Sequence, residues 1–141
     1  MCKLNYFILY SKYIFYSFLL FPSYLDTSNV TPLIFVLSSG SDPMANFLRF
    51  AEDMKYMDKF YSISLGQGQG PVAANLIDKS LRLGHWVFLQ NCHLATSWMP
   101  QMENIVRNIS LGVIKAHEDF RLFLSSMPQK KFSYKCVTKF S

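Results

Sequence analysis

Two side-chain amides follow an apolar run at the point where a nucleotide-hydrolysing protein would need acids. The run Trp86–Leu89 comes after the helix-stopping Gly84 and ends abruptly in Gln90 and Asn91, which predicts a buried strand with polar groups at its carboxyl end. In nucleotide-hydrolysing α/β proteins this strand commonly ends in an Asp–Glu pair that holds magnesium and orients water. Because amides carry no negative charge, Gln90 and Asn91 cannot neutralise a divalent ion or take a proton at neutral pH.

A second turn stands where a phosphate-binding loop would be. It follows the apolar run Leu33–Leu37 and reads Ser-Ser-Gly-Ser-Asp-Pro. A working loop needs several glycines, a lysine and a magnesium-binding hydroxyl, whereas this turn has one glycine, Gly40, followed by Ser41 and Asp42. The Asp42 carboxylate suits a helix N-cap before Pro43 and would repel a phosphate. We interpret the segment as a capped turn without a ligand.

The glycine-rich segment Gly66–Pro71 is a third candidate for chemistry. A dinucleotide fingerprint would require a third glycine at the position of Pro71, and no acidic residue ends the next strand. An anion site on this turn remains one reading. The other is that the glycines let the turn pack closely on a neighbouring module.

Cys92 and His93 could in principle form a nucleophile–base pair or part of a metal site. Adjacent residues in a strand point to opposite faces, and neither His85 nor His117 has a ligand-like spacing to them. We therefore expect structural roles for both, and no metal site.

Strand and helix patterns alternate along the chain. Strands are expected at residues 33–37 and 60–65, in the stretch 86–93 and at 120–124, with Ser125 and Ser126 as a closing turn after the last. This alternation predicts an α/β fold, a parallel sheet with helices on both faces. The residues expected to face the sheet are Met44, Phe47, Leu48, Ala51 and Met54 in the first helix, Val72, Leu76, Ile77 and Leu81 in the second, and Met102, Ile105, Val106 and Ile109 in the third.

Composition limits the class of protein. The 141 residues suffice for one domain with a core. The formal net charge of +5 comes from the ends, since residues 31–128 hold eight basic and eight acidic side chains. A phosphate-binding patch belongs on the folded part, so we expect no nucleic-acid partner. Three scattered cysteines predict a reducing compartment.

The two ends differ from the middle. Residues 1–22 form an aromatic-rich leader, and residues 133–141 form a short basic tail. Ser11 and Lys12 interrupt the apolar run of the leader, so we favour a non-homologous leader over a signal anchor. A membrane-anchored α/β fragment stays open as an alternative.

Several segments together resemble the dynein heavy chain, and their sequences are most similar to the axonemal type. The likeness covers residues 23–132 in one register and is carried by Thr31–Leu37 running into Gly40–Pro43, by Gly66–Pro71, by Trp86–Ala95 with Ser97–Pro100, and by Asp119–Leu122. The module resembled is the last, sixth AAA+ module of the motor ring. The resemblance implies a three-layer, P-loop NTPase-like fold with strand order 1-4-3-2 and a fifth strand beside the first.

The resemblance also implies a function. In AAA+ modules the polar residue after the fourth strand senses the terminal phosphate, which is the position of Ser125; without a phosphate to sense, we favour an ordinary turn. The module would be non-catalytic, without ATP or magnesium of its own. It would contact neighbouring AAA+ modules, with intermediate chains, light chains and microtubules reached through an ATP-hydrolysing, minus-end-directed motor of the cytoplasm, cytoskeleton and ciliary axoneme. The alternative is a small nucleotide-binding enzyme using Gly66–Pro71.

One structural expectation follows from the missing strand. The resembling region ends before that fifth strand, so the sheet is expected to be truncated. The strand at Leu33–Leu37 would then be an uncovered apolar edge, prone to aggregation.

Overall fold

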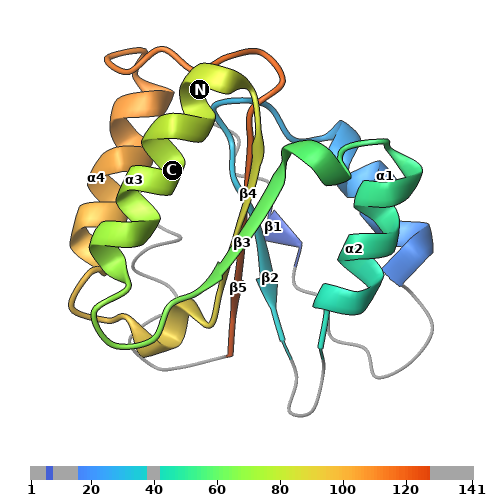
Figure 1. The fold of residues 1–141 in the computed structure, drawn as a ribbon, viewed down its shortest axis with the longest axis horizontal. Coiled ribbons are helices and arrows are strands. Elements are labelled where there is room, and N and C mark those ends of the chain that lie inside the picture. The colour runs from blue at the N-terminus through green and yellow to red at the C-terminus, as the bar shows by residue number, and fades with distance from the viewer. Residues whose placement is uncertain (1–5, 8–15, 38–41, 128–141) are drawn as a thin grey trace.

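The fold is described by a computed structural model over residues 6–7, 16–37 and 42–127. It is an α/β sandwich of three layers, with a five-stranded parallel sheet in the middle. Figure 1 shows that helices cover both faces of the sheet. No helix in this described part is long and apolar enough to cross a membrane.

The strands of the sheet lie in the order β1-β2-β5-β4-β3. Their bounds are β1 Tyr6–Phe7, β2 Leu33–Val36, β3 Phe60–Ser64, β4 Trp86–Gln90 and β5 Arg121–Ser126. The four strands that the sequence predicts therefore lie in the expected order 1-4-3-2. Since all pairs are parallel, their carboxyl ends meet at one edge of the sheet.

The helices are α1 Tyr16–Leu25, α2 Met44–Asp53, α3 Gly70–Leu83 and α4 Met99–Ser110. Helices α1 and α2 cover one face of the sheet, and α3 and α4 cover the other (Figure 1). Gly84 ends α3 in the left-handed conformation, with φ of 72°, as the sequence predicts.

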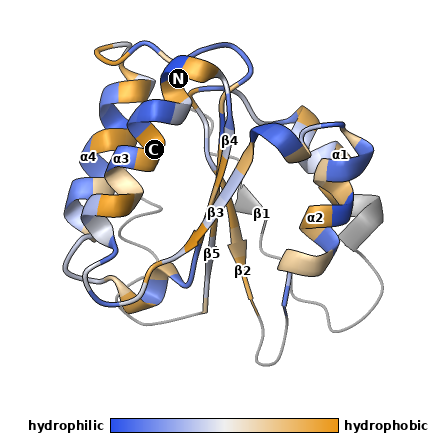
Figure 2. Cartoon of the chain, in the orientation of Figure 1, coloured by the Kyte–Doolittle hydropathy of each residue, from blue (hydrophilic) through white to orange (hydrophobic). Residues whose placement is uncertain are grey.

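The two faces of the sheet bury different kinds of side chain. Alternate residues of each strand point to opposite faces, so Trp86 and Phe88 lie on the side of α2 whereas Val87 and Leu89 lie on the side of α3 and α4. One layer is therefore mainly aromatic and the other mainly aliphatic. Figure 2 shows the central strands as hydrophobic and the helices as banded, with hydrophilic residues between their hydrophobic ones.

The predicted inward faces of two helices need correction. In α2, Phe47 and Ala51 are buried as expected, but Leu48 is exposed and Phe50 is buried in its place. In α3, Ile77 and Leu81 are buried as expected, but Val72 is half exposed, and the small residues Ala73 and Ser80 complete the buried stripe. Both errors have one cause: Leu48 and Val72 are each next to a buried residue in sequence, and a one-residue step turns about 100° around a helix.

The expectation of an uncovered edge at β2 is wrong. Strand β1 pairs with β2 in parallel, with Tyr6 opposite Ile34 and Phe7 opposite Phe35. Helix α1 also runs across the boundary that the sequence places between residues 22 and 23. Residues assigned to the leader thus contribute a strand and part of a helix to the fold.

Candidate functional site

The candidate site is the carboxyl edge of the sheet, where the predicted pocket residues are distributed. Leu89 of β4 pairs with Leu124 of β5, so Gln90 and Ser125 follow at the same level on neighbouring strands. Gln90 in turn pairs with Ser64 of β3. Asp42 lies just before α2, the helix that follows β2 in the chain. Gly40 and Ser41 fall outside the described residues.

Asp42 behaves as the predicted helix cap. Its Oδ1 accepts a hydrogen bond from the backbone N–H of Met44 at 2.9 Å. Pro43 already has helical dihedral angles, φ −77° and ψ −14°, although the helical hydrogen bonds define α2 from Met44 onward. The carboxylate therefore takes up one of the free amides with which a helix start could otherwise hold an anion.

Asn91 has a structural partner in the neighbouring strand. Its Nδ2 donates to the Ser64 hydroxyl oxygen at 2.9 Å, which ties the ends of β3 and β4 together. The backbone at Asn91 is left-handed, with φ of 57°, a conformation that asparagine adopts more readily than most residues. The amide of Asn91 thus holds a turn.

Ser125 is not in a turn, and that interpretation is wrong. Ser125 and Ser126 are the last two residues of β5, opposite Phe35 and Val36 of β2, and both are buried. The strand continues because β2 extends alongside and offers backbone partners to both serines. Ser125 thus lies inside the sheet, one level below its edge.

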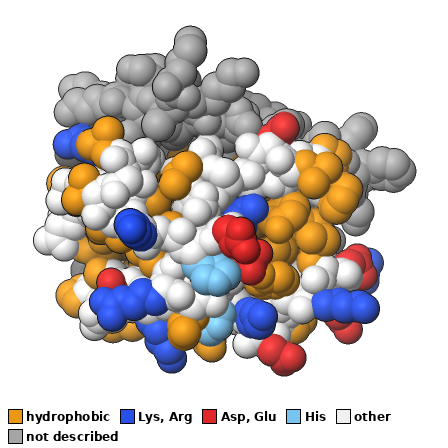
Figure 3. Space-filling model, turned by 90° about the horizontal axis from the view of Figure 1, so that it is seen from above, with side chains coloured by type: hydrophobic (Ala, Val, Ile, Leu, Met, Phe, Trp, Pro, Cys, Tyr) orange, Lys and Arg blue, Asp and Glu red, His pale blue; other side chains and the backbone are white. Residues whose placement is uncertain are grey.

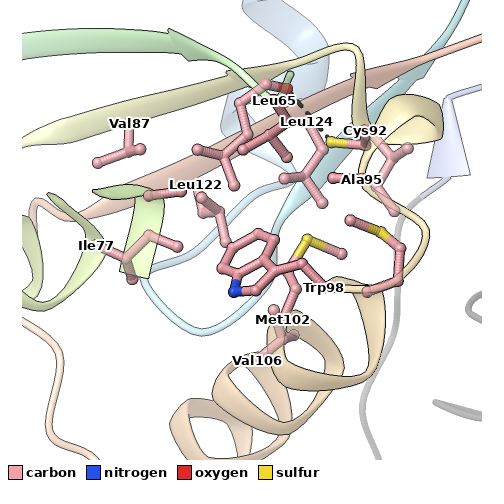
Figure 4. Close-up of a cluster of buried hydrophobic side chains, with 14 of the residues drawn as sticks. Leu65, Ile77, Val87, Cys92, Ala95, Trp98, Met102, Val106, Leu122 and Leu124 are labelled. Carbon is pink, nitrogen blue, oxygen red and sulfur yellow. Dashed lines mark hydrogen bonds between the residues drawn. The ribbon is translucent and has the colours of Figure 1, made fainter. Parts of the chain in front are cut away.

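The sequence argument assumed that Cys92 and His93 continue the strand, and this assumption is wrong. A short 3-10 turn, Cys92–Leu94, follows Asn91. Cys92 is fully buried, and its Sγ lies 3.5 Å from the carbonyl oxygen of Leu89, the contact drawn as a dashed line in Figure 4. His93 Nδ1 accepts a hydrogen bond from the N–H of Met127 at 3.2 Å. Both residues thus make structural contacts to the strands around them.

The glycine-rich turn borders the main groove on this edge. A groove of about 500 Å³ lies between residues 66–71 and the start of α4. The described residues that line it carry no charge; they are Gly66, Gln67, Gly68, Gly70, Pro71, Leu94, Ala95, Ser97, Trp98 and Gln101. A Cβ at Gly70 would come within 2.5 Å of Trp98 Cδ1. Gly70 therefore lets α3 approach Trp98, which lies within the aliphatic cluster in Figure 4.

Among the described residues, Tyr56 and His85 have shifted pKa values, and both lie at the opposite, amino edge of the sheet. Burial lowers the pKa of His85, and the positive charges of Lys59 and Lys79 lower it further. Burial raises the pKa of Tyr56, and the negative charge of Asp119 adds to the effect. Figure 3 shows this end, where histidine, acidic and basic side chains lie close together. Neither group faces the candidate site.

Two features of the site are missing from the sequence argument. The first is the hydrogen bond between Asn91 and Ser64. It forms because β3 pairs with β4, and sequence periodicity does not specify which strands pair. The contact between Gly70 and Trp98 joins residues far apart in sequence. The one local signal is Asn91 itself, because asparagine after a strand favours a left-handed turn.

Comparison with known proteins gives the family. Residues 28–139 match the dynein heavy chain region D6 P-loop domain. Mouse dynein axonemal heavy chain 1 is 53% identical over 107 residues, human dynein axonemal heavy chain 6 is 51% identical over 109, and mouse dynein axonemal heavy chain 3 is 53% identical over 111. These alignments cover 76–78% of this chain but only 2–3% of each relative.

The matches do not favour the two alternatives, a small nucleotide-binding enzyme and a membrane-anchored fragment. The matched region contains all four strands that the sequence predicts, together with α2, α3 and α4. The chain therefore belongs to the dynein heavy chain family, as a fragment of the axonemal type that carries the D6 P-loop domain.

Proposed function

We propose that this chain is a non-catalytic AAA+ ring module of an axonemal dynein motor. The parent motor would hydrolyse ATP in other modules and move towards microtubule minus ends, and this module would contribute a rigid wedge that closes the ring. The family match and the names of the relatives support the motor assignment.

The hydrogen bonds of Asp42 and Asn91 are the observation that supports the absence of catalysis. The carboxylate of Asp42 binds the first free amide of α2, and a phosphate approaching this helix start would meet its negative charge. Asn91 is bound to Ser64 and has no charge to offer a magnesium ion. The two positions where a nucleotide site needs a cation and an acid therefore hold an acid and an amide.

The partners and place of the module follow from the same proposal. Its surfaces would contact neighbouring AAA+ modules, and it would meet intermediate chains, light chains and microtubules only through the parent complex. ATP and magnesium would act in the parent motor and not in this module. The proposed location is the ciliary axoneme, within the cytoskeleton of the cytoplasm.

Calorimetric titration with ATP and magnesium tests the absence of a nucleotide site. We expect no binding heat up to millimolar nucleotide. Magnesium-dependent binding in the micromolar range would contradict the proposal. Loss of that binding in Asp42→Lys, with retention in Glu52→Lys, would then assign it to the start of α2, because Glu52 is an exposed acid on the same helix and gives the same change of charge.

A further inference from the structure

The two edges of the sheet differ in how much they need protection. Edge strand β3 exposes Tyr61, Ser62 and Ser64, so its outer side is largely polar. Strand β2, near the other edge, buries Leu33, Ile34 and Phe35. A flat apolar strand with unpaired backbone groups is a template for pairing with another chain. Protection is therefore required beside β2 far more than beside β3.

Strand β1, although only two residues long, supplies part of that protection. Its two residues pair with the two central residues of β2, Ile34 and Phe35. The backbone of β1 is thereby placed over the middle of the apolar edge, and any other strand that approached β2 would have to displace it.

Helix α1 covers the surface next to this edge. Leu20 is 2% exposed and packs in the aromatic cluster with Phe47 and Phe50. The Tyr24 ring lies 5.1 Å from Trp86 and 5.7 Å from Phe50, centroid to centroid. The Arg121 guanidinium lies 5.4 Å from the centre of the Tyr24 ring. Through Tyr24, α1 thus contacts Trp86, which is fully buried.

The strand and the helix both come from the part of the chain that precedes the family match, which begins at residue 28. We propose that β1 (residues 6–7) and α1 (residues 16–25) together form an internal cap on a self-association surface, made of the β2 edge and the aromatic cluster around Trp86. The partner that would bind this surface in place of the cap is a second copy of the chain. It offers the same apolar edge, and two such edges can pair antiparallel about a two-fold axis through backbone hydrogen bonds.

The double variant Tyr6→Pro, Phe7→Pro in the full chain tests the strand half of the cap. Proline has no backbone N–H and cannot donate to β2, whereas the matched control Tyr6→Ala, Phe7→Ala keeps both donors. Sedimentation under reducing conditions should show a dimer whose dissociation constant is at least tenfold lower in the proline pair than in the parent chain. The alanine pair should resemble the parent.

Leu20→Asp tests the helix half, with Phe21→Asp as its control because Phe21 is 48% exposed on the same helix. Leu20→Asp should strengthen self-association. At a concentration low enough for it to be monomeric, and in a Trp98→Phe background, it should raise the quenching of Trp86 fluorescence by acrylamide several-fold, and Phe21→Asp should do neither. Far-ultraviolet circular dichroism shows whether Leu20→Asp is unfolded. If it is, the proline double variant alone tests the proposal. Folded proline and Leu20→Asp variants that self-associate no more than the parent would overturn the proposal, as would an alanine pair that associates as strongly as the proline pair.

Discussion

At the scale of single residues, Gly70 fixes how closely α3 approaches α4. A Cβ at this position would lie 2.5 Å from Cδ1 and 2.6 Å from Cγ of Trp98, an indole that is itself buried. Gly70→Ala should therefore lower the free energy of unfolding by about 1–3 kcal/mol, the usual cost of overpacking.

Gly66→Ala is the matched control for this prediction. It lies in the same turn, and an added Cβ there would meet nothing within 4 Å. It should be neutral or stabilise by less than about 1 kcal/mol through the unfolded chain. Urea unfolding of Gly70→Ala and Gly66→Ala tests this difference. Equal midpoints would show that Trp98 moves aside without loss of stability.

His85 should make stability depend on pH. Its pKa is lowered from the ordinary 6.5, first by burial and then by Lys59 and Lys79, so the folded state binds the proton less readily than the unfolded chain does. The contribution of neutral His85 is fully present above pH 6.5 and is lost as pH falls towards the folded pKa. His85→Gln should therefore flatten the fall in urea midpoint between pH 7.5 and 5.5. An unchanged slope would assign the fall to other groups.

At the scale of elements, the starts of the four strands are predicted from sequence to within one residue, whereas the ends of β4 and β5 are not. Strands buried on both faces read as unbroken apolar runs, and glycines or caps bound them on either side. Helix faces are harder, because Ala73 and Ser80 fill buried positions without any hydrophobic signal. The end of β5 is missed for a different reason: Ser125 and Ser126 have turn chemistry but are held extended by β2.

The junction after β4 shows what an amide contributes to such a sheet. Asn91 has φ of 57° and a hydrogen bond to Ser64. Asn91→Gly loses only the bond, whereas Asn91→Ala loses the bond and strains a left-handed residue by about 1–2 kcal/mol. Alanine should therefore destabilise more than glycine, by about 1 kcal/mol in the free energy of unfolding. Equal losses in chemical unfolding would mean that the backbone there relaxes freely.

At the scale of the whole molecule, the layered fold and the strand order are predictable, the first from alternation of strands and helices and the second from the family resemblance. Strand β1 is not predictable, since two residues show no periodicity and pair through backbone groups alone. The site is predicted as a set of positions, but the bonds of Asp42 and Asn91 require the fold. The sequence therefore predicts which positions lie at this edge, and the structure shows which bonds Asp42 and Asn91 make there.

The two tryptophans provide a test of cooperativity across the sheet. Trp86 lies in the aromatic layer and Trp98 in the aliphatic layer, on opposite faces. Each central strand sends alternate side chains into both layers, so neither layer can open without disturbing the other. In Trp98→Phe, Trp86 fluorescence should follow the same urea transition as far-ultraviolet circular dichroism, and Trp98 should do so in Trp86→Phe. Because each substitution changes stability by itself, the comparison holds within a variant and not between the two. A fluorescence change that precedes the loss of circular dichroism in either variant would show that its layer unfolds separately, and that the sheet does not couple the two cores.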